Sequence, residues 1–115
     1  MNKEFVPYEQ ALELKELGFD DYNIAWYIII DEKPQLTFQN YSNHLCAPLY
    51  QQAFRWFREK YDLIEVITKV SSIVNYTFVA VFYKGNDNHF IGSYNTYEEA
   101  ELACLKKLIE IAKQI

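Results

Sequence analysis

The residues from Tyr76 to Tyr83 scarcely alternate in polarity, because in the order Tyr-Thr-Phe-Val-Ala-Val-Phe-Tyr only Thr77 lacks a large apolar part or an aliphatic side chain. Successive side chains leave a β-strand on opposite faces, so this strand is apolar on both. An antiparallel strand with one face in water normally alternates apolar and polar residues. We therefore expect another layer of protein to cover each face of this strand. One comes from the chain's own helices, and the second comes either from its other helices or from another protein surface.

Four further strands are predicted around this one. The residues from Ile24 to Ile30 are β-branched or aromatic and lead into a polar turn, Asp31 to Pro34, and a second run, Gln35 to Gln39. This pattern predicts a hairpin, although the length of the first run leaves a helix open. Residues 40–46 read as a loop. The remaining two strands are 63–70, with its drier face on Ile64, Val66 and Val70, and 89–94 after a turn at 84–88.

Three helices are predicted from their start and stop signals. Pro7 suits the first turn of a helix that ends at Gly18 in a left-handed conformation, with Phe19 packing back on Leu14. Pro48 opens a second helix over 49–60 with a wide aromatic face.

The third helix begins at a capping box. Thr96 and Glu99 have the required spacing, and the helix they start is expected to reach Lys113. Its apolar residues cover about half of the circumference, which is wider than the ~100° stripe of an ordinary surface helix.

These elements predict an α+β fold with a mostly antiparallel sheet, a hairpin plus a three-stranded meander, and about three helices packed on it. The expected order is α-β-β-α-β-β-β-α. No repeat, low-complexity stretch or linker interrupts the sequence, so residues 1–115 are predicted to form a single domain.

Composition and charge narrow the possible functions. Half of the 115 residues are hydrophobic and ten are tyrosines, which excludes a disordered segment and suits either an aromatic core or a half-buried interface. The net charge is -5, and residues 1–35 hold eight acids against three lysines. An acidic first third disfavours a surface that wraps a phosphate backbone. Such an excess of acidic residues more often forms an ordinary solvent-exposed surface than a binding site.

No basic leader or apolar run of ~20 residues is visible, so we expect a cytoplasmic protein with no membrane span and with reduced thiols at Cys46 and Cys104. With His44 and His89, these cysteines make up a nominal set of metal ligands. Their spacing lacks the close pairs of structural zinc sites. No residue pattern marks an oxyanion site. The three glycines are isolated from one another, so the sequence has no glycine-rich phosphate-binding loop. We predict no enzymatic activity, no catalytic or metal-binding residues, no cofactor and no small-molecule ligand.

Nucleic-acid binding is the alternative function. A helix, three antiparallel strands and a helix is also the order of a double-stranded-RNA-binding domain. That family places lysines at the start of the last helix, where this chain has Tyr97-Glu-Glu-Ala-Glu101. The charge there has the opposite sign. What remains as a candidate nucleic-acid surface is Arg55, Trp56 and Arg58.

Three segments, 8–20, 47–61 and 97–111, resemble a family of small uncharacterised proteins from Bacteroides-type bacteria and their phages or prophages. The resemblance reaches both ends of the chain, whereas the middle strands are less distinctive. It implies a cytoplasmic, phage-derived α/β protein, and it brings no known activity and no catalytic residues to carry over. It is also compatible with a homodimer.

Our leading hypothesis is a non-enzymatic protein–protein interaction module that forms a homodimer or binds another protein. The surplus apolar surface of the 76–83 strand and of the last helix motivates it. Glu101 falls on the apolar side of that helix, where it either reaches solvent or meets a cation from a partner. The candidate interface residues are Tyr76, Phe78, Phe82, Tyr83, Tyr94, Tyr97, Glu101 and Leu105.

Overall fold

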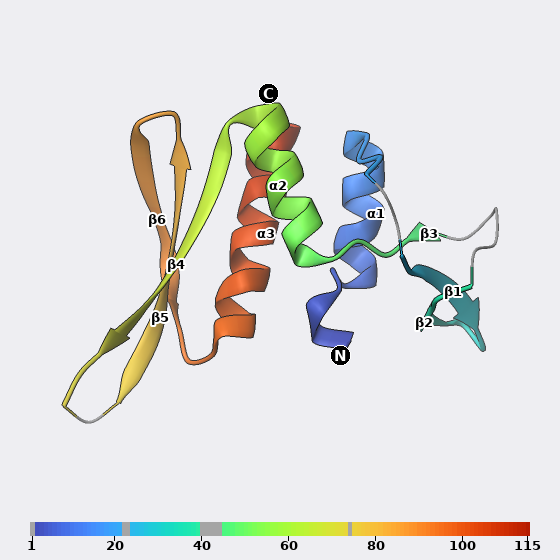
Figure 1. The fold of residues 1–115 in the computed structure, drawn as a ribbon, viewed down its shortest axis with the longest axis horizontal. Coiled ribbons are helices and arrows are strands. Elements are labelled where there is room, and N and C mark those ends of the chain that lie inside the picture. The colour runs from blue at the N-terminus through green and yellow to red at the C-terminus, as the bar shows by residue number, and fades with distance from the viewer. Residues whose placement is uncertain (1, 22–23, 40–44, 74) are drawn as a thin grey trace. The chain divides into compact units, whose positions relative to one another are not determined.

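The computed structural model describes residues 2–21, 24–39, 45–73 and 75–115 (Figure 1). Two compact units make up the chain, the first ending at residue 53 and the second beginning at residue 54. The boundary falls inside the helix α2 (Tyr50–Tyr61). No linker marks it in the sequence, and the prediction of a single domain stays a prediction.

The first unit combines one helix with a small antiparallel sheet of strand order β2-β1-β3. Tyr27 on β1 ties the sheet to the N-terminal segment, because its hydroxyl donates a hydrogen bond of 2.6 Å to the Val6 carbonyl. The core of this unit gathers Phe5, Ala25 and Ala47. Its elements are a 3₁₀ turn (Asn2–Glu4), α1 (Tyr8–Leu17), β1 (Trp26–Ile30), β2 (Lys33–Thr37) and β3 (Leu45–Cys46).

Local sequence signals in this unit act as predicted. Gly18 has φ 95°, and its N–H donates to the Lys15 carbonyl while the Phe19 N–H donates to the Leu14 carbonyl. This is the Schellman ending expected for α1. The run for which a helix was left open forms a strand, β1. The hairpin turn is shorter than predicted: Asp31 and Glu32 form it with φ 52° and 64°, whereas Lys33 and Pro34, expected in the turn, belong to β2.

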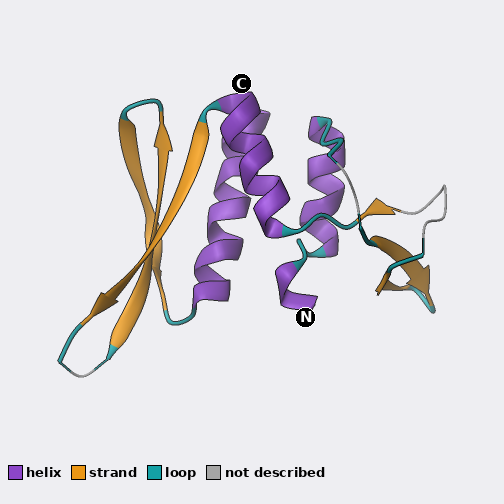
Figure 2. Cartoon of the chain, viewed as in Figure 1, coloured by secondary structure: helices purple, strands orange, loops and turns teal. Residues whose placement is uncertain are grey.

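The second unit is a three-stranded antiparallel meander with α3 lying along one face of it (Figure 2). The N-terminus of α3 is capped as predicted, since the Thr96 hydroxyl accepts the Glu99 N–H at 3.1 Å and donates to the Glu99 carboxylate at 3.0 Å. The sheet is β4 (Leu63–Ser71), β5 (Tyr76–Lys84) and β6 (Asp87–Tyr94), and α3 spans Tyr97–Lys113.

The predicted fold class, α+β, is confirmed. One element differs: Leu45 and Cys46, expected in a loop, form β3 and pair with Tyr27 and Trp26 of β1. A two-residue strand has no periodicity of its own and exists only through that pairing. The described helices include none that is long and apolar enough to cross a membrane.

Candidate interaction surface

The central strand β5 presents two different faces to its surroundings. One face carries Ala80 and Phe82, which are buried, and Phe78, whose ring meets the ring of Tyr97 on α3 at 6.0 Å. This face is therefore the one that α3 covers. The apolar character of the strand on this side is explained by the core of its own unit.

On the opposite face, which we call the open face, the described part of the second unit places no helix. Its middle row crosses all three strands, because Val66 on β4 and Phe90 on β6 both pair with Val81 on β5. Val66 is 38% exposed and Phe90 is 68% exposed. The full open face consists of Ile64, Val66, Thr68, Val70, Thr77, Val79, Val81, Tyr83, Asn88, Phe90 and Ser93.

Polar groups surround the middle row, and none of them is charged. Thr68 and Ser93 flank Val79, Asn88 pairs with Tyr83, and Thr77 pairs with Val70. The charged side chains of the three strands, such as Glu65 and Lys69, alternate onto the side of the sheet that faces α3. An apolar centre with an uncharged polar margin is the anatomy of a protein–protein interface.

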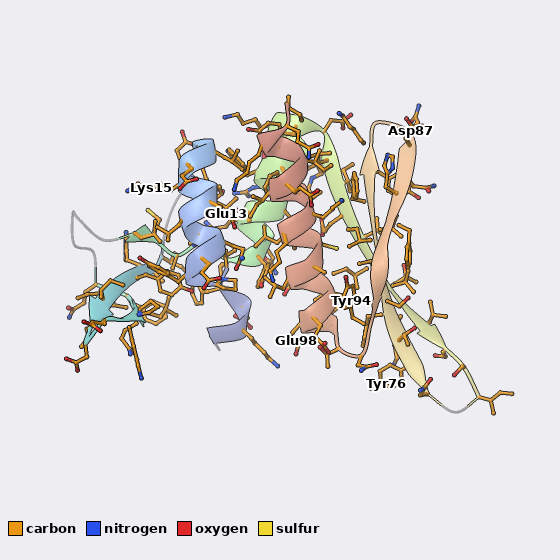
Figure 3. All side chains as sticks on the ribbon, turned by 180° about the vertical axis from the view of Figure 1, so that it is seen from behind. Glu13, Lys15, Tyr76, Asp87, Tyr94 and Glu98 are labelled. Carbon is orange, nitrogen blue, oxygen red and sulfur yellow. The ribbon has the colours of Figure 1, made fainter. Side chains whose placement is uncertain are left out.

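Three of the predicted interface residues, Tyr76, Phe78 and Tyr97, form an aromatic cluster at the end of the unit where α3 begins, and Tyr94 pairs with Phe78 in the strand register. Figure 3 shows Tyr76 and Tyr94 at this end together with Glu98, and Asp87 at the other. The rings of Tyr76 and Phe78 lie 5.7 Å apart, and Phe78 reaches Tyr97. Tyr76 and Tyr97 are 50% and 44% exposed, so this cluster is partly open to solvent.

The remaining predicted residues lie in three other places. Phe82 is 3% exposed and Leu105 is fully buried, so both belong to the core and the interface we propose does not include them. Tyr83 lies on the open face. The residues missed by the sequence reasoning are those beside Tyr83 on that face. The sequence feature that could have identified them is the lack of charged residues at every second position of three successive strands.

Glu101 is half-buried on α3, near two other carboxylates. Burial, followed by the charges of Glu98 and Glu65, raises its pKa to about 7. The pKa of Glu65 on β4 is also raised by burial, while a backbone hydrogen bond and the charge of Arg58 oppose that rise. Glu101 therefore faces like charges within its own unit, and a cation would be the favourable neighbour for it.

Glu101→Gln is expected to make the protein more stable at pH 8 and to change nothing near pH 4. The raised pKa means that the folded state keeps a proton that the unfolded chain has lost, so folding stability falls as pH rises from about 4.5 to about 7. The gain at pH 8 is on the order of 1 kcal/mol, because solvent screens a half-exposed carboxyl. Urea unfolding at both pH values measures it. Glu110→Gln, at an exposed position of α3, is the control, and equal gains at the two pH values would contradict the expectation.

The alternative nucleic-acid surface does not converge on one side of α2. At about 100° per residue, Trp56 and Arg58 lie roughly 160° apart around the helix. Arg55 pairs with Glu59 at 3.7 Å, and the charge of Arg58 acts on Glu65. The Trp56 ring meets Tyr61 and lies under the Lys60 ammonium, 5.0 Å from the ring centroid. No observation favours this surface as a phosphate-binding one, although the prediction itself stays untested.

The histidines and cysteines are distributed through the fold without forming a described metal site. His44 lies outside the described residues. His89 stacks on Phe82 with ring centroids 4.8 Å apart, and burial raises the pKa of Cys104 to about 12, which keeps it a thiol. Among the residues that the structure describes, no three His, Cys, Asp or Glu side chains are grouped so that they could hold a metal ion.

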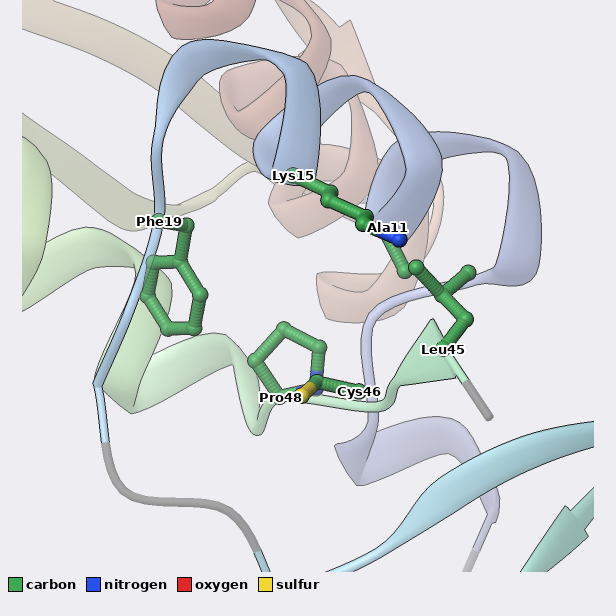
Figure 4. A pocket seen from close by; sticks show the side chains of 6 residues that line it. All are labelled: Ala11, Lys15, Phe19, Leu45, Cys46 and Pro48. Carbon is green, nitrogen blue, oxygen red and sulfur yellow. The ribbon is translucent and has the colours of Figure 1, made fainter. Parts of the chain in front are cut away.

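Cys46 lines a pocket within the first unit (Figure 4). The pocket has a volume of about 160 Å³. Ligand sites usually measure ~300–1,000 Å³, so this hollow is too small to be a strong candidate. Its wall is formed by Ala11, Lys15, Phe19, Leu45, Cys46 and Pro48.

The geometry thus defines a small α+β protein whose second unit has one uncharged sheet face that no described helix of that unit covers. No protein-family model, curated protein or solved structure matches the chain. The resemblance to the Bacteroides-type and phage family stays a prediction.

Proposed function

We propose that this protein is a non-enzymatic, cytoplasmic interaction module that forms a homodimer by stacking the open faces of two copies. The observation that carries the proposal is the row Val66, Val81 and Phe90, which crosses the whole sheet and stays in solvent at both edges. An exposed apolar patch of a few hundred Å² with a polar rim often marks a protein–protein contact. Two such sheets pack about 10 Å apart and exclude water from both middle rows.

The charge distribution favours a second copy over another occupant. Each chain carries a net charge of -5, so two copies repel one another unless their contact avoids the charged groups. The open face satisfies this condition, because none of the side chains that the described strands place on it is charged. A partner selected by charge would instead require ionic groups at the margin, where this face has threonine, serine and asparagine.

The size of the open face predicts how strong the dimer is. Nine residues at ~3.3 Å per residue and three strands at ~4.8 Å give a footprint of roughly 30 Å by 14 Å, or about 400 Å² per copy. Specific interfaces average ~800 Å² per partner, so this one is about half that size and has the size of a weak, transient contact. We therefore expect a reversible dimer with a micromolar dissociation constant.

Sedimentation equilibrium across 1–100 μM protein tests the proposal. The expected result is a mass that rises from the 13.7 kDa of one chain to twice that value. A mass of 13.7 kDa at every concentration would exclude the homodimer. The resemblance of residues 8–20, 47–61 and 97–111 to a phage-associated family supports a homodimer and a phage or prophage origin, both as expectations.

A further inference from the structure

Strand β4 forms one edge of the sheet in the second unit. Strand β5 pairs with one side of it, and none of the described strands pairs with the other side. Its nine residues, Leu63–Ser71, pair with β5 in one unbroken register, and none of them is proline or glycine. A regular edge of this length presents a row of unpaired backbone N–H and C=O groups that a further strand can extend.

The opposite edge of the sheet, β6, is less regular. Gly92 pairs with Ala80 whereas Phe90 pairs with Val81, so Ile91 is an extra residue that forms a β-bulge. A bulge twists an edge strand and is one of the features that protect sheet edges against pairing. Helix α3 also packs mainly on β5 and β6. The β4 edge is therefore the more accessible one for a further strand.

Two opposite charges lie four residues apart on β4, both on the side of the sheet that faces α3. Lys69 is exposed, and its ammonium lies 4.2 Å from the centre of the Tyr76 ring. Glu65 is half-buried, and the charge of Arg58 on α2 acts on it. Because positions 65 and 69 are equally far from Ile67, the middle residue of the strand, the two charges are placed symmetrically with opposite signs.

Antiparallel pairing of two β4 strands in full overlap matches these charges. When Leu63 lies opposite Ser71 of a second copy, the two-fold axis passes through Ile67, and Glu65 of each copy lies opposite Lys69 of the other. Side chains directly opposite one another have Cβ atoms about 4.5–5.5 Å apart, and opposite charges there are favourable. A register centred on Glu65 or on Lys69 would instead bring like charges together. The charges thus favour the register that uses the whole strand.

From this complementarity we propose that two copies of the chain join at their β4 edges and form one continuous antiparallel sheet of six strands. Four or five residues of each β4 strand point their N–H and C=O groups outward, which gives roughly eight to ten hydrogen bonds across the edge. Two ion pairs between Glu65 and Lys69 flank the two-fold axis. The lysine of the second copy thereby brings a cation next to Glu65, whose charge acts on Glu101.

Edge pairing is compatible with the stacking of open faces proposed above and does not depend on it. In the six-stranded sheet the two open faces lie on the same side and stay in solvent. Together they measure about 800 Å², which is the average size of a specific interface. The edge contact itself buries little apolar surface, so we expect it to be weaker than stacking, with a dissociation constant on the order of 0.5 mM.

Two charge variants of the full chain test the edge contact, both in a parent protein with Val66→Lys, a change that places a charge on the open face to prevent stacking. Lys69→Glu leaves Glu65 opposite a glutamate, and Glu65→Lys leaves Lys69 opposite a lysine. Each variant alone should pair at least tenfold more weakly than the parent, which sedimentation equilibrium near 1 mM measures. An equimolar mixture of the two restores both opposite-charge pairs and should pair like the parent. Both variants keep a negative net charge, so general attraction does not explain that recovery.

Lys106→Glu, the same change of charge at an exposed position of α3, is the control and should pair like the parent. In ¹H–¹⁵N spectra, adding the unlabelled variant to its labelled counterpart should shift the amide signals of residues 63–71, and spectra of each variant at low concentration verify its fold. A parent that keeps the mass of one chain, 13.7 kDa, at 1 mM would overturn the proposal. So would a mixture that does not pair, a Lys106→Glu protein that loses pairing as Lys69→Glu does, or shifts confined to β6. If stacking does not occur, the parent still reports on the edge, so the two proposals fail separately.

Discussion

Val66→Lys is expected to abolish self-association at micromolar concentration. Val66 lies in the middle row of the open face, so stacking two copies would bring a lysine from each into the dry centre of the contact. An ammonium without a partner is costly to bury, and like charges across an interface add several kcal/mol. The dissociation constant should rise roughly 100-fold or more, which sedimentation equilibrium measures directly.

Ile73→Lys is the matched control for this variant. Ile73 has a fully solvent-exposed side chain in the turn between β4 and β5, and it receives the same change from a β-branched residue to a lysine. The control should dimerise like the wild type. If both variants dimerise normally while remaining folded, the open face is not the contact. If both lose dimerisation, a general charge effect explains the result.

Leu105→Ala is expected to destabilise the protein by about 2–5 kcal/mol. Leu105 is fully buried on α3, so truncating it leaves a cavity that the neighbouring Leu108 and Ile109 fill only in part. Urea unfolding followed by circular dichroism, at a concentration well below the dissociation constant of the dimer, measures the loss. Working there keeps dimerisation from contributing to the apparent stability.

Leu102→Ala serves as the comparison, because Leu102 is half-buried on the same helix. It should cost clearly less than Leu105→Ala, since fewer contacts are lost. This pair also separates the core role of Leu105 from the predicted interface role. If Leu105→Ala left the monomer as stable as the wild type and changed only the dimerisation, Leu105 would belong to the interface after all.

Local signals were sufficient for most elements of the fold. The Gly18 helix ending, the Thr96 cap and the aromatic face of α2 each depend on residues within a few positions of one another, so the sequence displays them directly. The short strand β3 could not be predicted. Its two residues are strand only because β1, some 20 positions earlier, lies beside them.

The candidate interface also combines features that the sequence shows with others that only the tertiary structure reveals. The sequence established that the 76–83 strand is apolar on both faces and that one face needed a cover beyond a single helix. It could not tell which face α3 takes, because a period of two assigns residues to sides without naming either side. Tyr83 was therefore grouped with Phe82, its neighbour in sequence, although the two point to opposite sides of the sheet.

The sequence by itself determined every α-helix and strand except β3, and it determined the doubly apolar central strand, because hydrophobic periodicity and capping are encoded over short distances. The tertiary structure decided which face of that strand belongs to the core and which belongs to the surface. Packing α3 on this side of the sheet buries Ala80 and Phe82 and half-buries Phe78. On the other side it leaves the uncharged row of Val66, Val81 and Phe90, of which Val66 and Phe90 are exposed and Val81 is half-buried. Three strands had to be placed in register before their separate apolar residues became one continuous patch.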